Sequence, residues 1–320
     1  MAEYTRDRVT LARLPSGVAV ETTVHTYGDG DPVVYAQAAQ HGREINGSAA
    51  LRRLHDELEG VELNGTLHAV PVADPLTFDA VSYTTPEAYD SVNPNMNRCW
   101  PGDPDGSLHE RMAAALWEYA GDADHIVDLH TGSPEMLTHT VYLKGDEGCR
   151  ELAEAFGTDL LLAEAAGEDA DDEWEKRSFG GKLRVAATRE GIPSITPELA
   201  HNKELVEDAI DAGVTGMKRV LRHTGVLDDG EPVPDWDGTR ARNHLGRVKA
   251  SDSGLFRAAD GLAIGDEVEE GDYVGEVFDP TTYETLHEAH ADRSGIVYSV
   301  AREATVTAGQ TLVGVAIRLD

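Results

Sequence analysis

The sequence PVVYAQAAQHGRE, residues 32–44, places an apolar run directly before a turn that carries a histidine and a glutamate. Val33, Val34 and Tyr35 lie near the start of this run, and its composition predicts a buried strand over Pro32–Gln40. Runs of the same kind predict further strands over Thr66–Val72, His125–Leu129 and Ile192–Thr196.

The segments between these runs have the period of amphipathic helices. Leu51, Leu54 and Leu58 share one face of a helix predicted over Ser48–Leu58. Similar patterns predict helices over Ser107–Tyr119, Asp146–Phe156 and Lys203–Arg222. Because strands alternate with helices, residues 1–225 are expected to form an α/β domain, with a mostly parallel or mixed sheet flanked by helices.

The pattern changes after residue 225. Turn residues and a run of charge at Asp228–Asp235 favour a linker over 226–245. Beyond it, glycines interrupt short runs that contain Val, Ile and Tyr, and no helical period is present. Residues 246–320 are therefore expected to form a smaller all-β domain.

Charge and cysteine content exclude several classes of protein. The chain carries 59 Asp and Glu against 27 Lys and Arg, a net charge of −32, which argues against nucleic acid and anionic membranes as partners. Its two cysteines, Cys99 and Cys149, make neither a disulfide framework nor a thiolate zinc cluster. No apolar stretch has the length of a signal peptide or a membrane span, so we expect a soluble, salt-adapted cytoplasmic protein.

The turn after the first predicted strand is a candidate metal site. In the H-x-x-E pair, His41 and Glu44 can reach a single ion, and Gly42 and Gly47 allow the backbone to bend around it. An ordinary polar turn is the alternative for this motif alone.

A second candidate lies at the end of another predicted strand. Asp128 and His130 share one face of a strand, so the acid could support the imidazole. A hydrogen-bonded histidine at a strand end is the alternative. In open α/β sheets, however, ligands bind beyond the carboxyl ends of the strands, where His41, Glu44 and His130 would all lie.

Two histidines and one carboxylate with an open fourth position are typical of a catalytic zinc site. Glu198, at the end of a further predicted strand, could act beside the ion as a general base. An acid at the start of a helix is the alternative for Glu198.

The long segment Asp74–Gly106 is rich in Pro, Asn and Asp and lacks clear periodicity, and loops of this length are usually functional or disordered. Within it, Arg98 can present a planar fork to a carboxylate, and Asn97 can add an amide. A surface arginine tied to an acid is the alternative.

Together these motifs resemble, in order and approximate spacing, the succinylglutamate desuccinylase/aspartoacylase family, which is related to zinc carboxypeptidases. The resemblance spans most of the chain, because the C-terminal region is similar to the β-domain that many members carry. It implies a zinc carboxypeptidase-like fold and one Zn²⁺ per chain. By this resemblance the ligands would be His41, Glu44 and His130, the substrate contacts Asn97 and Arg98, and the base Glu198.

Some positions depart from the family's pattern. Leu199–Asn202 follows Glu198 where members have a glycine pair. No arginine lies between Ala80 and Met96, where some members have a further oxyanion-stabilising arginine. Arg184 and Arg189 are candidates for binding a second substrate carboxylate.

The resemblance and the residues together predict a zinc-dependent amidohydrolase that removes an acyl group from a small N-acyl amino acid or a similar amine. A carboxypeptidase-like metallopeptidase and a non-catalytic metal-binding protein are the alternatives. The β-domain would either cap the cleft or serve packing or oligomerisation. A homo-oligomer is therefore one possibility for this protein.

Overall fold

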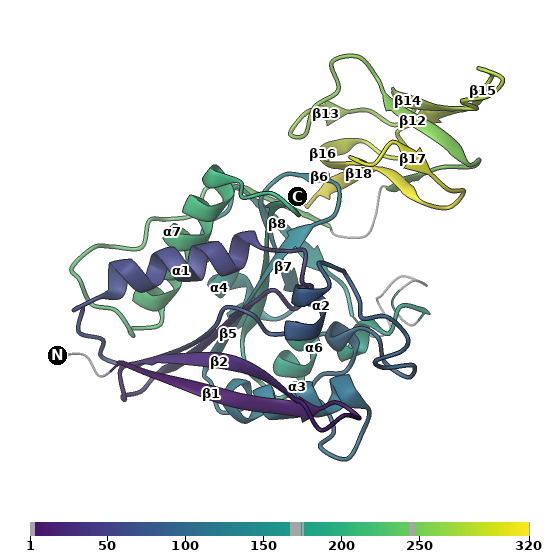
Figure 1. Ribbon diagram of the computed structural model, residues 1–320. Helices are drawn as coiled ribbons and strands as arrows, with labels where there is room; N and C mark the ends of the chain where they lie inside the picture. Colours follow the sequence, from purple (N-terminus) through teal and green to yellow (C-terminus); the bar gives the residue numbers. More distant parts are fainter. Residues whose placement is uncertain (1–3, 167–173, 175, 243–246, 320) are drawn as a thin grey trace.

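The computed structural model describes residues 4–166, 174, 176–242 and 247–319. One mixed sheet runs through most of the molecule, with helices on both sides of its larger part (Figure 1). Its strands follow the spatial order β1 (Tyr4–Arg13), β2 (Ala19–Tyr27), β4 (Thr66–Val70), β3 (Val33–Ala38), β5 (His125–Gly132), β9 (Ser194–His201), β7 (His139–Leu143), β8 (Leu160–Glu164), β10 (Thr239–Arg242), β18 (Thr311–Arg318), β16 (Gly295–Val300) and β13 (Glu267–Val268).

Parallel pairs form two blocks of this sheet. Strands β4, β3, β5 and β9 are parallel neighbours, as are β7, β8 and β10. The blocks meet where β7 pairs antiparallel with β9, while β1 and β2 add an antiparallel edge. The predicted mixed sheet is therefore confirmed, and each of the four predicted strands overlaps an observed one. Strand β9 extends past the predicted end at Thr196, so Glu198 lies inside it.

Two helical layers cover the sheet. On one face lie α1 (Asn46–Leu58), α4 (Glu147–Phe156) and α7 (Glu207–His223), and on the other lie α3 (Leu108–Ala120) and α6 (Leu183–Arg189) (Figure 1). Alternate residues of β5 serve the two cores, because Val127 and Leu129 pack under the first layer and Ile126 under the second. None of the described helices has the length and hydropathy needed to cross a membrane.

The C-terminal region is all-β in the part that the structure describes. A separate sheet has the order β15 (Thr285–His290), β14 (Tyr273–Phe278), β12 (Gly254–Ala258) and β17 (Thr305–Val306), and β11 (Arg247–Lys249) pairs with β18. This confirms the predicted smaller all-β unit. Within 226–245, β10 pairs with both β8 and β18, so it joins the two regions. The ranges 1–225, 226–245 and 246–320 stand as a proposed division into domains.

One strand of the central sheet leads directly into the β-domain. Three residues after the end of β5, the short strand β6 (Glu135–Met136) begins and pairs with β16. The chain that carries His130 is thereby fastened to the β-domain within a few residues.

A buried histidine clamps the long segment Asp74–Gly106, which contains α2 (Pro75–Asp79) and the 3-10 turn η1 (Met96–Arg98). On α3, His109 places Nε2 3.3 Å from Asp74 Oδ2 and Nδ1 3.2 Å from Asp90 Oδ2, with all three residues buried. Burial opposes a proton on His109, but the two aspartates outweigh it and raise its pKa. This clamp, His109 between Asp74 and Asp90, therefore favours the protonated form of the imidazole.

We expect His109→Gln to lower the free energy of unfolding by about 3–5 kcal/mol, because it leaves two buried carboxylates without their cation. Since the pKa is raised in the folded protein, the ionised histidine stabilises fully below about pH 6.5, and this contribution is lost as pH rises through the folded value. Denaturant unfolding at pH 6 and pH 9, with the exposed His223→Gln as control, measures the difference. An equal loss at both pH values would contradict the clamp.

Candidate active site

Three side chains with metal-binding atoms meet at the carboxyl ends of β3 and β5. His41 and Glu44 follow β3, and His130 lies in β5. All three are buried, and one ligand atom from each lies within 4.8 Å of the others. Because a Cβ on Gly42 would lie 2.0 Å from the Thr77 backbone, only glycine allows the turn to approach α2 so closely.

His41 is held as a neutral imidazole. Its Nδ1 donates to the Tyr83 carbonyl at 2.8 Å, and its ring stacks on Tyr83 with centroids 3.9 Å apart. Burial lowers the pKa of His41 to about 4. Since neutral imidazole binds metals, this histidine is ready to present Nε2 as a ligand.

His130 is oriented by carboxylates on both sides. Its Nε2 lies 2.9 Å from Asp128 Oδ2, and its Nδ1 lies 3.0 Å from Glu44 Oε2. Gln37 and Gln40 donate to Asp128 from β3 and the turn after it. Burial opposes a charge here, but Asp128 and Glu44 outweigh it and raise the pKa of His130. The surroundings therefore favour a positive charge at this point, which fits a metal cation supported by an outer carboxylate.

Glu198 stands beside this group on the neighbouring strand. In the β5–β9 ladder, Glu198 is the register partner of His130. Burial is the main reason why the pKa of Glu198 rises to about 7, so this carboxyl can take up and release a proton near neutral pH. The alternative of a helix-start acid is excluded, because Glu198 lies within β9 and α7 begins only at Glu207.

The long loop brings Asn97 and Arg98 to the same place. Asn97 Nδ2 lies 3.4 Å from His130 Nε2, and Asn97 Oδ1 accepts from the Leu183 backbone. The Arg98 guanidinium lies 4.8 Å from the Phe179 ring centroid, and no described carboxylate forms an ion pair with it. The alternative of a surface arginine tied to an acid is therefore not what the structure shows.

These groups line one cavity of about 280 Å³. Several lining residues could not be predicted from the sequence, because they come from distant segments without a motif: Tyr83, Phe179, Lys182, Arg247 and Tyr298. Arg184 also lines the cavity and is paired with Glu164, whereas Arg189 bonds to the Gly180 carbonyl and is not among the lining residues.

The lining is basic although the chain is acidic. Six lining residues are arginine or lysine and two are glutamate, in a protein with a net charge of −32. Lys182 is one of these basic residues, and its Nζ lies 3.0 Å from Glu164 Oε1 and 3.6 Å from the Phe179 ring centroid. Such a lining attracts anionic ligands.

Comparisons with known proteins show which family and which solved structures the chain is similar to. The family model described as "Succinylglutamate desuccinylase/Aspartoacylase catalytic domain" matches residues 31–224. The N-alpha-acetyl-L-2,4-diaminobutyric acid deacetylase of Halomonas elongata is 28% identical over 315 residues, covering 93% of this chain and 86% of that protein.

Solved structures are similar over nearly the whole chain. The crystal structure of a succinylglutamate desuccinylase/aspartoacylase from Rhodobacter sphaeroides has a TM-score of 0.81 at 25% identity, covering 100% of this chain and 96% of that one. The product-bound ectoine utilization protein EutE (DoeB) of Ruegeria pomeroyi has a TM-score of 0.83 at 22% identity, covering 98% and 95%, and this likeness concerns the fold alone.

Proposed function

Because the chain belongs to the succinylglutamate desuccinylase/aspartoacylase family, we propose that it is a zinc-dependent deacylase, which hydrolyses the linear amide of a small N-acyl amino acid. The observation that carries this proposal is the buried group of His41, Glu44 and His130 beside Glu198, a carboxyl whose pKa of about 7 suits proton transfer. A cavity of about 280 Å³ favours a small substrate over a peptide.

The donor set fits zinc. Two imidazoles and a carboxylate leave a fourth position open, as in catalytic zinc sites. His41 would bind through Nε2, since the Tyr83 carbonyl takes Nδ1, and His130 through Nδ1, since Asp128 takes Nε2. When bound, zinc supplies a Lewis acid for the amide carbonyl and the attacking water.

The chain's own residues do the rest of the chemistry. Glu198 accepts the proton that the attacking water loses as the new C–O bond forms, and then passes it to the amine nitrogen as the amide C–N bond breaks. Asp128 keeps the ring of His130 in place through Nε2. Arg98 binds the carboxylate of the amino acid, and Asn97, beside His130, holds the substrate next to the ligands.

The basic lining should make substrate binding depend on pH through Lys182. Burial lowers the pKa of Lys182 to about 8, so its positive charge is lost as pH rises through that value. We expect the KM for an N-acyl amino acid to rise about tenfold above pH 8, the cost of losing a charge-assisted contact. Lys182→Arg keeps its charge and should remove this rise.

Steady-state KM values between pH 6.5 and pH 9.5 for both proteins decide the point. The same alkaline rise in wild type and Lys182→Arg would show that another group causes it.

The function is tested by release of free amine from a panel of N-acetyl and N-succinyl amino acids, with added zinc and with a chelator. Molar salt should be present, because it screens the repulsion among the acidic side chains of a chain with a net charge of −32. The same acidic composition supports our expectation of a salt-adapted cytoplasmic protein. Chelator-sensitive release from one class of substrate is expected. Release from peptides alone would favour a carboxypeptidase-like enzyme, and tight zinc binding without any hydrolysis would favour a non-catalytic protein.

A further inference from the structure

A buried carboxylate stands behind the basic lining of the candidate active site. Glu164 is the last residue of β8, and only 1% of its surface is exposed. Its Oε1 accepts a hydrogen bond from Lys182 Nζ at 3.0 Å, and its Oε2 accepts one from the Arg184 guanidinium. Lys182 and Arg184 both line the cavity of about 280 Å³, whereas Glu164 does not. Glu164 therefore serves two bases of the lining from a place where it does not meet the substrate.

The two bases are held in different ways. Arg184 is 3% exposed, and its Nη1 also donates to Thr196 Oγ1 in β9 at 2.9 Å. Lys182 lies directly before α6, with its Nζ over the ring of Phe179. Because lysine and arginine are rarely buried without an acid, Glu164 is the group that allows both side chains to lie in the wall. Arg184 in turn fixes the position of Glu164.

Lys182 also lies among other cations. The Phe179 ring centroid is 3.6 Å from Lys182 Nζ, 4.8 Å from the guanidinium carbon of Arg98 and 6.0 Å from that of Arg177. Without a nearby acid, these like charges and the burial of Lys182 would both favour the neutral amine.

The balance of charges around Lys182 depends on Glu164. Burial is the largest effect and lowers the pKa of Lys182 to about 8, and Arg184 and Arg98 lower it as well. Glu164 opposes them through its charge and its hydrogen bond. Lys182 in turn favours the ionised form of Glu198 on β9. The attraction of Glu164 thus keeps the pKa of Lys182 from falling further.

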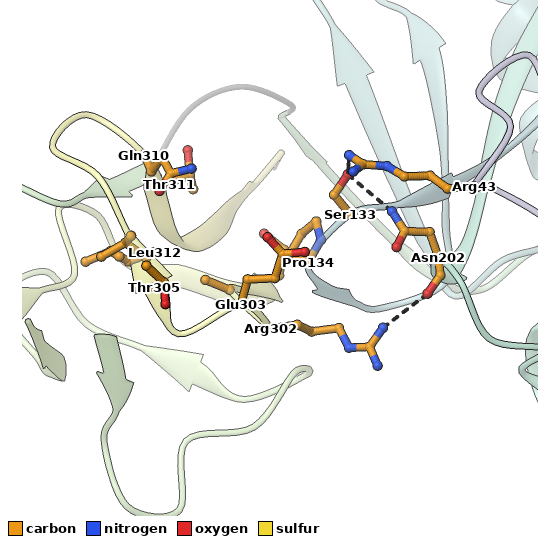
Figure 2. Close-up of a pocket in the computed structure, with 13 residues that line it drawn as sticks. Arg43, Ser133, Pro134, Asn202, Arg302, Glu303, Thr305, Gln310, Thr311 and Leu312 are labelled. Carbon is orange, nitrogen blue, oxygen red and sulfur yellow. Dashed lines mark hydrogen bonds between the residues drawn. The ribbon is translucent and has the colours of Figure 1, made fainter. Parts of the chain in front are cut away.

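An adjoining cavity shows an exposed ion pair for comparison. It has a volume of about 390 Å³ and lies between the α/β region and the β-domain, and Arg43 and Ser133 line both cavities. Arg43 donates to Ser133 Oγ at 2.7 Å, and Arg302 donates to the Asn202 carbonyl at 3.2 Å (Figure 2). The acid that pairs with Arg302 is Glu204, whose side chain is 60% exposed. Water screens such a pair, whereas the buried charge of Glu164 is screened much less.

We propose that Glu164 is a positioning residue for the basic wall of the active site: shared between Lys182 and Arg184, it holds both cations at the cavity and preserves the positive charge of Lys182. The proposal deepens the proposed deacylase function and rests on it, since this wall would receive the anionic substrate. Arg184 serves as the anchor of Glu164, and Lys182 presents its charge to the cavity.

The pKa of Lys182 tests this directly and without any substrate. It is measured by NMR titration of the lysine Cε groups in the full-length, zinc-loaded protein, where Lys182→Arg lacks one signal and so assigns it. The wild-type midpoint is expected at about pH 8. Glu164→Gln should lower the midpoint by about one pH unit or more, because the nearest opposite charge is removed. Arg184→Met removes a like charge and should raise it.

Two further variants control the measurement. Glu164→Asp keeps the charge and should recover most of the wild-type midpoint. Glu204→Gln removes the exposed acid that pairs with Arg302, and it should leave the Lys182 midpoint unchanged.

The direction of the shift separates the proposal from simple damage to the fold. A variant that only opened the wall to water would raise the midpoint toward the ordinary value of lysine, about 10.4. A raised or unchanged midpoint in Glu164→Gln would therefore overturn the proposal. If Glu164→Gln does not fold, Arg184→Met decides, and a midpoint that is unchanged or lower than in wild type would contradict the role of Glu164.

Kinetics connect this charge to substrate binding. The alkaline rise in KM for the best panel substrate should begin about one pH unit lower in Glu164→Gln than in wild type, with zinc content unchanged. A KM profile that keeps its wild-type midpoint while the Lys182 midpoint moves would show that Glu164 does not act on substrate binding. If no N-acyl amino acid is hydrolysed, the proposed function fails, and the NMR midpoints still judge Glu164 separately.

Discussion

Glu198→Gln is expected to lower kcat by about 10²–10⁴-fold while zinc binding and the fold are kept. The amide of glutamine has nearly the shape of the carboxylate but cannot accept the proton from water. Glu198 lies outside the group of His41, Glu44 and His130, so the ligands themselves are unchanged. Turnover of the best panel substrate, together with zinc content and thermal unfolding, measures the effect.

Glu118→Gln, on the exposed face of α3, is the control for loss of one carboxylate. If Glu198→Gln turned over substrate as fast as this control, the assignment of the base would be wrong. If it lost zinc as well as activity, Glu198 would belong to the ligand set instead.

His130→Ala is expected to lose the metal itself. It removes one of three ligands, so the fall in zinc affinity should exceed that caused by losing an outer partner. Asp128→Asn removes only the carboxylate that holds Nε2 of His130, and we expect it to weaken zinc binding by about 10–100-fold. Competition with a chromophoric chelator gives both affinities, with the exposed His223→Ala as control.

The order of these zinc affinities tests whether His130 is a ligand and Asp128 its outer partner. His130→Ala should bind zinc more weakly than Asp128→Asn, and Asp128→Asn more weakly than the control. Zinc affinity of His130→Ala equal to that of wild type would place the metal elsewhere in the molecule.

Much of the candidate site follows from local patterns in the sequence. His41, Glu44 and His130 each stand at or after an apolar strand, and parallel strands end at one edge of a sheet, so their convergence could be expected. The alternation of residues along β5 likewise places Asp128 on the same face as His130. Their roles in binding and catalysis stay proposals that the variants above test.

The basic wall could not be predicted, because it depends on contacts between distant segments. Lys182 reaches the cavity at the start of α6, and Arg247 and Tyr298 reach it from the β-domain. No spacing in the sequence marks these residues, since nothing local requires their charge or ring. Arg43 is similar, because its place between two cavities follows from where the β-domain sits and not from the turn that contains it.

Some strands were missed for a simpler reason. The sequence of β1, YTRDRVTLAR, is almost entirely exposed, so it lacks the apolar run that predicted the buried strands. Strand β8 is a short apolar run, LLLAE, which periodicity alone cannot distinguish from a buried helical segment. In the same way, α7 begins four residues after its predicted start, because Lys203 adopts a positive φ of 64° and its backbone N–H bonds to the Arg43 carbonyl.

A zinc titration of the metal-depleted protein tests whether this chain is a zinc-dependent deacylase. Bound zinc and amine release from the best panel substrate are measured on the same samples. Activity is expected to rise in proportion to bound zinc and to level off at one ion per chain. Full activity before zinc is added, or one tightly bound zinc per chain with no hydrolysis, would contradict it.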